Sequence, residues 1–232
     1  MPTAPRPTAP TPAAPTPAPP SLTERRKAET QLEIARAAAA LFAERGSAVT
    51  ADDIARAAGV ALRTFYRYFR TKEDAVAPLL AVGVRQWLTE LRRLAGEADG
   101  PSVRDVLERA ARQALTPSDE RAAEALRWTR GLLRAMRDDP ALRSVWHRVH
   151  HDSEEALIPV LAGMTDGGPL EVRLAAAAAN TAMRVAVETW AAADDGADAG
   201  PAASRAEDPA ELVARGMRAL TAGLPGLDRR RA

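Results

Sequence analysis

Apolar residues before Gly46 recur at the spacing of one buried helical stripe, and this pattern constrains the fold more than any other feature of the chain. Gly46 ends this helix, and Thr50 is placed to cap a second, short helix that Gly59 closes. A third helix follows directly. Short helices joined by such tight turns share one small core, so the region is predicted to be a compact helical domain. The stripe consists of Ile34, Ala37, Ala38, Leu41 and Phe42.

The third helix, around Phe65-Tyr66-Arg67-Tyr68-Phe69, has an apolar and a polar face. Helical spacing places Leu62, Phe65 and Phe69 on the inner face. The outer arc then carries Arg63, Thr64, Arg67 and Tyr68, with Tyr66 at its flank.

Positive charge is concentrated in this region. Between Ile54 and Lys72 there are five basic residues and no acidic residue, a local net charge of 5 − 0 = +5, whereas the whole chain has a net charge of only +1. Arg can contact guanine edges, and Thr and Tyr hydroxyls can bind phosphate. The pattern predicts a helix-turn-helix whose third helix contacts DNA. The alternative is a solvated face on an ordinary helical domain.

The segment from Ile34 to Asp74 resembles the DNA-binding domain of the tetracycline-repressor (TetR) family of transcriptional regulators. The matching residues are Ile34-Ala35, Leu41-Phe42-Ala43-Glu44-Arg45-Gly46, Thr50, Asp53-Ile54-Ala55, Ala58-Gly59-Val60, Thr64-Phe65-Tyr66-Arg67-Tyr68-Phe69 and Lys72-Glu73-Asp74. The resemblance implies a three-helix DNA-binding domain, a larger helical ligand-binding domain and a homodimer on a partly palindromic operator. It also implies phosphate contacts by Thr50, Thr64, Tyr66, Tyr68 and Lys72, and base contacts by Leu62, Arg63 and Arg67.

One position departs from the family pattern. Ala61 stands where the family usually has Ser, at the start of the recognition helix. Without a hydroxyl, the helix lacks a cap worth about 1 kcal/mol and a possible phosphate contact.

The remaining sequence predicts further helices and no strand, because apolar and polar residues never alternate over a strand length. The expected fold is all-α, with about nine helices. A fourth helix is expected from Thr71 to about Leu94, bent at Pro78. The domains are expected at 1–20, 21–72 and 73–228: a disordered Pro-rich tail, the helix-turn-helix domain and a ligand-binding and dimerisation domain. The last resembles actinobacterial members close to mycofactocin-type regulators.

The C-terminal two-thirds carries large aromatic residues that form either core or pocket walls. The resemblance favours a ligand pocket at Trp87, Trp128, Trp146 and His147. His147, His150 and His151 share nearly one helix face, with Glu154 and Glu155 one turn on. This spacing can bind a metal, but an amphipathic surface with His–Glu pairs is the simpler interpretation, so no metal is expected.

Small and apolar residues of the last two helices form a candidate dimer seam, whose alternative is burial within one subunit. The seam comprises 174–179, Met183, Val187, Leu212, Met217 and Leu220. The resemblance favours a homodimer through these two helices.

The predicted function is a ligand-responsive transcriptional repressor that binds double-stranded operator DNA and is released by a small apolar effector of unknown identity. The alternative is an architectural DNA binder without a sensor pocket. An enzyme is not expected, because the sequence has no nucleophile elbow or phosphate-binding glycine loop. No cofactor is expected. The chain has no Cys, no membrane-length apolar run and no secretory signal, so a cytoplasmic protein without membrane contact is expected.

Overall fold

The computed structural model describes residues 21–97, 102–193 and 208–228. Within these residues the regular structure consists of nine α-helices and two short 3-10 turns, with no strand, as the sequence predicts. The Pro-rich tail predicted at 1–20 lies outside the described residues, as do residues 98–101, 194–207 and 229–232.

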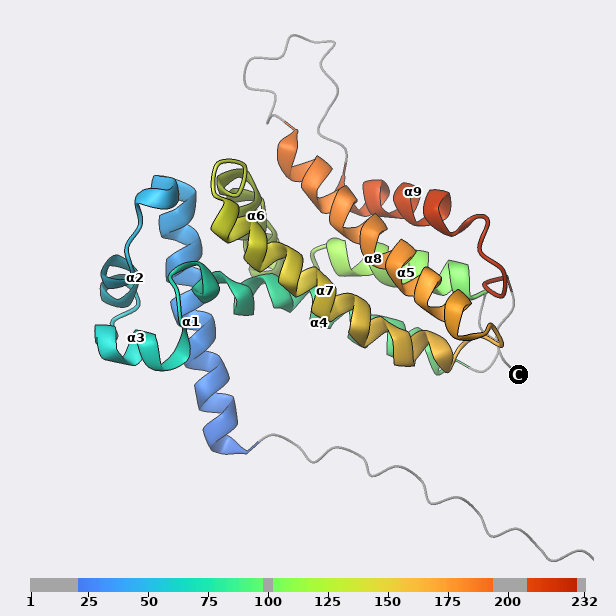
Figure 1. Cartoon of the computed structure of the whole chain (residues 1–232), viewed down its shortest axis with the longest axis horizontal. Helices are drawn as coiled ribbons and strands as arrows, with labels where there is room; N and C mark the ends of the chain where they lie inside the picture. Colours follow the sequence, from blue (N-terminus) through green and yellow to red (C-terminus); the bar gives the residue numbers. More distant parts are fainter. Residues whose placement is uncertain (1–20, 98–101, 194–207, 229–232) are drawn as a thin grey trace, which may run out of the picture.

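The N-terminal helices form a small domain at one end of the molecule (Figure 1). The Ser21 side chain caps the first helix by accepting a hydrogen bond from the Glu24 backbone amide at 3.2 Å. In turn, the Ser21 backbone amide donates to the Glu24 carboxylate at 2.7 Å. Phe42, Ile54 and Phe65 are fully buried at the centre. The elements are α1 (Leu22–Arg45), η1 (Gly46–Ala48), α2 (Ala51–Ala57) and α3 (Leu62–Tyr68).

Glycine is required at both turns of this domain. Gly46 has a φ of 55° and Gly59 a φ of 67°, in the left-handed region that side chains with a Cβ rarely adopt. The predicted ends of α1 and α2 therefore follow from backbone conformation.

The larger domain packs its helices around buried residues that are continuous with the core of the smaller domain. The long helix α8 contacts α9, α7 and α6, and α5 lies against α4 and α9. Its elements are η2 (Glu73–Val76), α4 (Ala77–Ala95), α5 (Val103–Leu115), α6 (Glu120–Ala135), α7 (Pro140–Ala162), α8 (Pro169–Ala192) and α9 (Pro209–Thr221).

The prediction that a continuous helix begins at Thr71 and bends at Pro78 is wrong. The Thr71 hydroxyl accepts from the Asp74 amide at 3.1 Å, but this opens the 3-10 turn η2 and not an α-helix. Helix α4 begins at Ala77, so Pro78 lies in its first turn, where a missing N–H breaks no bond. The two domains are therefore connected by the 3-10 turn η2 and not by a helix with a proline kink.

The two domains meet along α1 and α6, and again where α7 reaches η2. Gly131 of α6 approaches Ala43 of α1 so closely that a Cβ added at Gly131 would lie 3.1 Å from the Ala43 Cβ. Arg148 of α7 forms an ion pair with Asp74 of η2. The first contact links the two domains directly, and the second holds η2, the turn that connects them, against α7.

Candidate nucleic-acid interface and effector cavity

The outer face of α3 is exposed and polar. Phe65 is fully buried and Phe69 is 6% exposed, so both face the core as predicted. The prediction that Leu62 also faces inward is wrong: its side chain is 38% exposed, because it lies in the first turn, beyond the edge of the small core. Tyr66 is exposed, whereas Thr64 and Tyr68 are half-buried at the border of the face.

The positive charge of this face is smaller than the sequence count of +5. Asp52, just outside the counted segment, forms an ion pair with Arg56 one helical turn later. Arg63, Arg67 and Arg70 are exposed and form no ion pair with any carboxylate of the described residues. The Arg67 guanidinium lies 5.0 Å from the centre of the Tyr68 ring, which orients it along α3. Three guanidinium groups therefore remain available to phosphate or base edges.

Thr50 and Lys72, both predicted to contact phosphate, form hydrogen bonds within the helix-turn-helix in this structure. The Thr50 hydroxyl accepts from the Asp53 amide at 3.1 Å, and the Thr50 backbone amide donates to the Asp53 carboxylate at 3.0 Å, which completes a capping box on α2. The hydroxyl also donates to this carboxylate at 2.7 Å. These bonds from Thr50 lower the pKa of Asp53. Lys72 Nζ donates to the backbone carbonyls of Ser47 and Val49 at 2.6 and 2.7 Å. Both side chains therefore position the turn between α1 and α2.

Ala61 occupies the N-cap position of α3 and supplies no side-chain hydrogen bond. The recognition helix therefore begins without the cap that Thr50 gives to α2, as its sequence implied.

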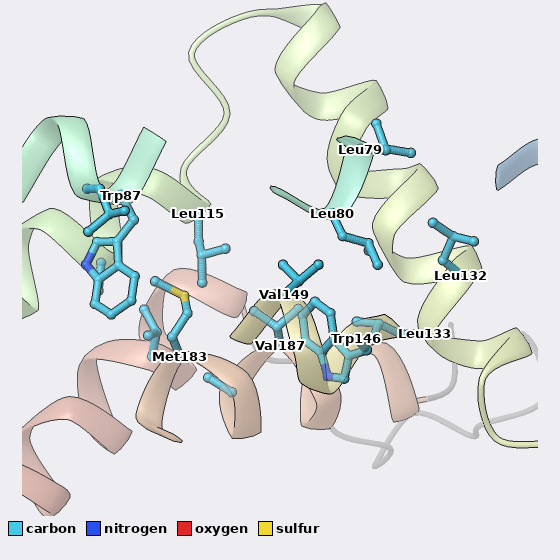
Figure 2. Close-up of a cluster of buried hydrophobic side chains, with 14 of the residues drawn as sticks. Leu79, Leu80, Trp87, Leu115, Leu132, Leu133, Trp146, Val149, Met183 and Val187 are labelled. Carbon is cyan, nitrogen blue, oxygen red and sulfur yellow. The ribbon is translucent and has the colours of Figure 1, made fainter. Parts of the chain in front are cut away.

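The larger domain contains a central cavity of about 490 Å³. Its walls come from α4 (79–90), from the end of α5 and the connection that follows it (113–118) and from α6 (122–129). Its floor consists of Trp146, His150, Met183 and Val187. Figure 2 shows Met183 and Val187 of α8 and Trp146 of α7 below Leu80 and Leu115. Such a volume is within the range of small-molecule sites.

The residues predicted for the pocket lie in different places. Trp146 lines the central cavity, and Trp87 lies within its wall, with no exposed surface. Trp128 packs half-buried against the core elsewhere on α6. His147 is exposed and lines a second cavity of about 430 Å³, on the other side of Trp146.

His150, which sequence reasoning placed on a shared histidine face, is the polar residue of the cavity floor. Its side chain is 4% exposed, while those of His147 and His151 are exposed, so the three do not converge. Burial lowers the pKa of His150 to about 4, so the ring is neutral near pH 7. Helical spacing could have indicated this burial, since His150 lies at i+4 from Trp146.

The fold, the exposed basic face and the cavity together define a class of protein: a two-domain helical regulator that binds DNA. Residues 34–77 match the family model for bacterial regulatory proteins of the tetR family. The N-terminal domain of this chain is therefore similar to the DNA-binding domain of TetR-family transcriptional regulators.

Solved structures share the fold over most of the chain. A TetR-family regulator from Syntrophomonas wolfei is 18% identical, with a TM-score of 0.59 over 84% of this chain and 96% of that chain. FadR from Bacillus subtilis, solved in complex with stearoyl-CoA, is 20% identical, with a TM-score of 0.54 over 83% and 98%. AlkX from Dietzia sp. is 21% identical, with a TM-score of 0.52 over 85% and 98%. No curated protein matches the chain. None of the helices in the described part of the chain has the length and hydropathy of a membrane span.

Proposed function

We propose that the protein is a repressor that binds a palindromic operator as a homodimer and is released by a small, mostly apolar effector in the central cavity. The observation that carries this proposal is the outer face of α3, where Arg63, Arg67 and Arg70 stand exposed and unpaired with any carboxylate of the described residues. Arg63 and Arg67 are proposed to contact bases with Leu62. Phosphate contacts are proposed for Thr50, Thr64, Tyr66, Tyr68 and Lys72.

The dimer is proposed to form through α8 and α9. Several residues of the predicted seam, among them Met183, Val187, Leu212 and Met217, are buried within the subunit, so they cannot form its contact surface. Other apolar side chains remain exposed on the same helices. On α8 these lie within an arc of about 60° at 100° per residue, which is one face of a helix. The exposed residues are Leu170, Leu174 and Val185 of α8 and Leu220 of α9.

The signal is proposed to pass from cavity to DNA through α4 and α6. Both helices line the central cavity, α6 contacts α1 at Gly131, and α4 continues from η2. An effector that separates the cavity walls would therefore shift the DNA-binding domains of the dimer, whose spacing must match one helical turn of DNA, about 34 Å. To switch fully it must favour the released state by several kcal/mol.

The cavity favours this function over an architectural DNA binder, which would have a filled core in the larger domain. The direct test is selection of binding sites from a random duplex library by the purified full chain. Enrichment of an inverted repeat is expected, with half-sites about 10 base pairs or a multiple apart. Recovery of sequences without a common motif would contradict operator recognition.

A further inference from the structure

The second cavity of the larger domain, which shares Trp146 with the central cavity, has a basic lining. Its volume is about 430 Å³, and three arginines and one glutamate line it, a net charge of 3 − 1 = +2 with His147 neutral. Positive charge gathered in a hollow attracts anions more strongly than the same charge spread over a surface. The charged residues of the lining are Arg137, Arg143, Arg184 and Glu188.

The one carboxylate of this lining is already engaged. Glu188 accepts from Trp146 Nε1 at 2.7 Å, and Arg184 Nη1 donates to its two carboxylate oxygens at 3.1 and 2.9 Å. The charge of Arg184 is therefore balanced by Glu188. Arg137 and Arg143 are exposed and form no ion pair with any carboxylate of the described residues, so their two charges remain.

Backbone carbonyls hold these two arginines in place. Arg143 Nη2 donates to the carbonyls of Met136 and Arg137 at 3.1 and 2.6 Å, and Arg137 Nη2 donates to the Ala192 carbonyl at 3.0 Å. These carbonyls lie at the C-terminal ends of α6 and α8, each of which carries about half a negative charge. The two helix ends therefore offset about one of the two positive charges. The Nη1 groups of both arginines have no partner in the described part of the chain.

The base of the cavity is apolar. Leu133, Met136 and Trp146 are buried and line it, and Figure 2 shows Leu133 of α6 beside Trp146 of α7. An inorganic anion has no surface that would cover these side chains, whereas an organic anion does. Planar guanidinium groups bind phosphate oxygens through parallel hydrogen bonds, and a phosphate monoester near pH 7.5 carries close to two negative charges.

We infer that the second cavity binds a small organic phosphate, a phosphate monoester with an apolar body, whose phosphate group is held by Arg137 and Arg143. The apolar body lies against Leu133, Met136 and Trp146. This site is separate from the proposed effector cavity, so the failure of either proposal leaves the other standing.

Two probes test the ligand class: 1-naphthyl phosphate and inorganic phosphate. Calorimetric titration of the full chain at pH 7.5 and low ionic strength measures their affinities. We expect the ester to bind roughly tenfold more tightly than inorganic phosphate, because it also buries its rings. Equal affinities, or no binding of the ester, would overturn the inference. Absence of binding is the result expected if Asp194 and Asp195, which follow α8 in the sequence, neutralise the arginines instead.

Matched variants locate the site. Arg137→Gln and Arg143→Gln should each weaken binding of the ester roughly tenfold, the effect of one charged hydrogen-bond donor. Arg127→Gln is the control, because it removes an exposed arginine of α6 that lines neither cavity, and it should bind the ester normally. Unchanged affinity in both arginine variants of the site, or an equal loss in the control, would contradict the assignment.

A third variant is expected to gain affinity, which a damaged fold does not produce. Glu188→Gln keeps an oxygen that can accept from Trp146 Nε1 but removes the negative charge of the lining. This variant should bind 1-naphthyl phosphate roughly fivefold more tightly than the wild type. Unchanged or weaker binding of the ester by Glu188→Gln would show that the charge of this cavity does not select its ligand.

Discussion

At the scale of single residues, the helix-turn-helix depends on a few side chains with defined tasks. Thr50 caps α2 and Lys72 ties the turn between α1 and α2 through two backbone carbonyls. Ala61, in contrast, begins α3 without a cap. The recognition helix is thus the less stabilised of the two helices in the motif.

Ala61→Ser should stabilise the domain. A serine at this N-cap can accept from the free amides of the first turn of α3, which is worth about 1 kcal/mol. Chemical denaturation of the full chain measures the change in unfolding free energy. Ala28→Ser, at an exposed interior position of α1, is the matched control and should be neutral or slightly destabilising. Equal effects of the two substitutions would show that Ala61 is not a capping position.

His150 should make stability depend on pH. Its pKa is about 4 in the folded protein because of burial, against 6.5 for an unperturbed histidine, so the unfolded chain binds the proton more readily. This stabilisation is complete above pH 6.5 and is lost as the pH falls toward 4. Between pH 7.5 and 5 the loss is roughly 2 kcal/mol.

The measurement compares unfolding free energies of the wild type and His150→Gln at these two pH values. The variant should lose less stability on acidification than the wild type, because the two proteins share every titrating group except His150. His151→Gln, which removes an exposed histidine from the next position, should retain the wild-type dependence. If the unfolding free energy of His150→Gln depended on pH as strongly as that of the wild type, the pKa of His150 would not be lowered by folding.

At the scale of helices, the contact between α1 and α6 joins the cavity to the DNA-binding domain. Residues 122–129 of α6 line the central cavity, and Gly131 lies directly beyond them. Because a Cβ at Gly131 would lie 3.1 Å from the Ala43 Cβ, closer than an ordinary contact, an alanine at this position would push the two helices apart by a few tenths of an ångström.

Gly131→Ala should therefore weaken operator binding, by roughly fivefold or more if it biases the spacing of the DNA-binding domains. Gly83→Ala is the matched control: it lies within α4, and its added Cβ would meet no atom within 4 Å. Both substitutions raise helix propensity equally, so a difference in operator affinity isolates the contact with Ala43. Equal affinities would remove this contact from the mechanism.

Sequence alone predicts much of the element order, because caps and glycines are local signals. Ser102 caps α5 and Asp208 caps α9 as their positions indicated. The features that the sequence does not predict depend on tertiary packing. Nothing in the local pattern separates a 3-10 turn from the first turn of a helix, so the sequence does not predict η2. The cavity floor also depends on which helices meet, so the spacing from Trp146 can indicate that His150 is buried but not that it lines a cavity.

At the scale of the whole molecule, repression requires two DNA-binding domains held at a fixed distance. On the exposed face of α8, one subunit leaves uncovered Leu174, which belongs to the predicted seam, and Val185, which does not. A two-fold symmetric contact through this face and α9 would bury these apolar side chains.

Leu174→Arg should convert the dimer to a monomer at micromolar concentration, because it places a charge in the apolar seam. Sedimentation velocity measures the change in mass. Leu22→Arg is the matched control: this leucine is also exposed, at the start of α1, far from the seam in sequence. If both variants remain dimeric, the interface lies elsewhere.

The central claim, that the outer face of α3 binds operator DNA, is tested most directly by mobility shift with the selected operator at two salt concentrations. The wild type should form a specific complex that weakens with salt, as phosphate contacts require. Arg67→Ala should lose about 1–3 kcal/mol of binding free energy. Arg127→Ala, which removes an exposed arginine of α6 whose one ion-pair partner among the described residues is Glu120, should bind normally. Unchanged affinity in Arg67→Ala, or equal loss in both variants, would contradict the account.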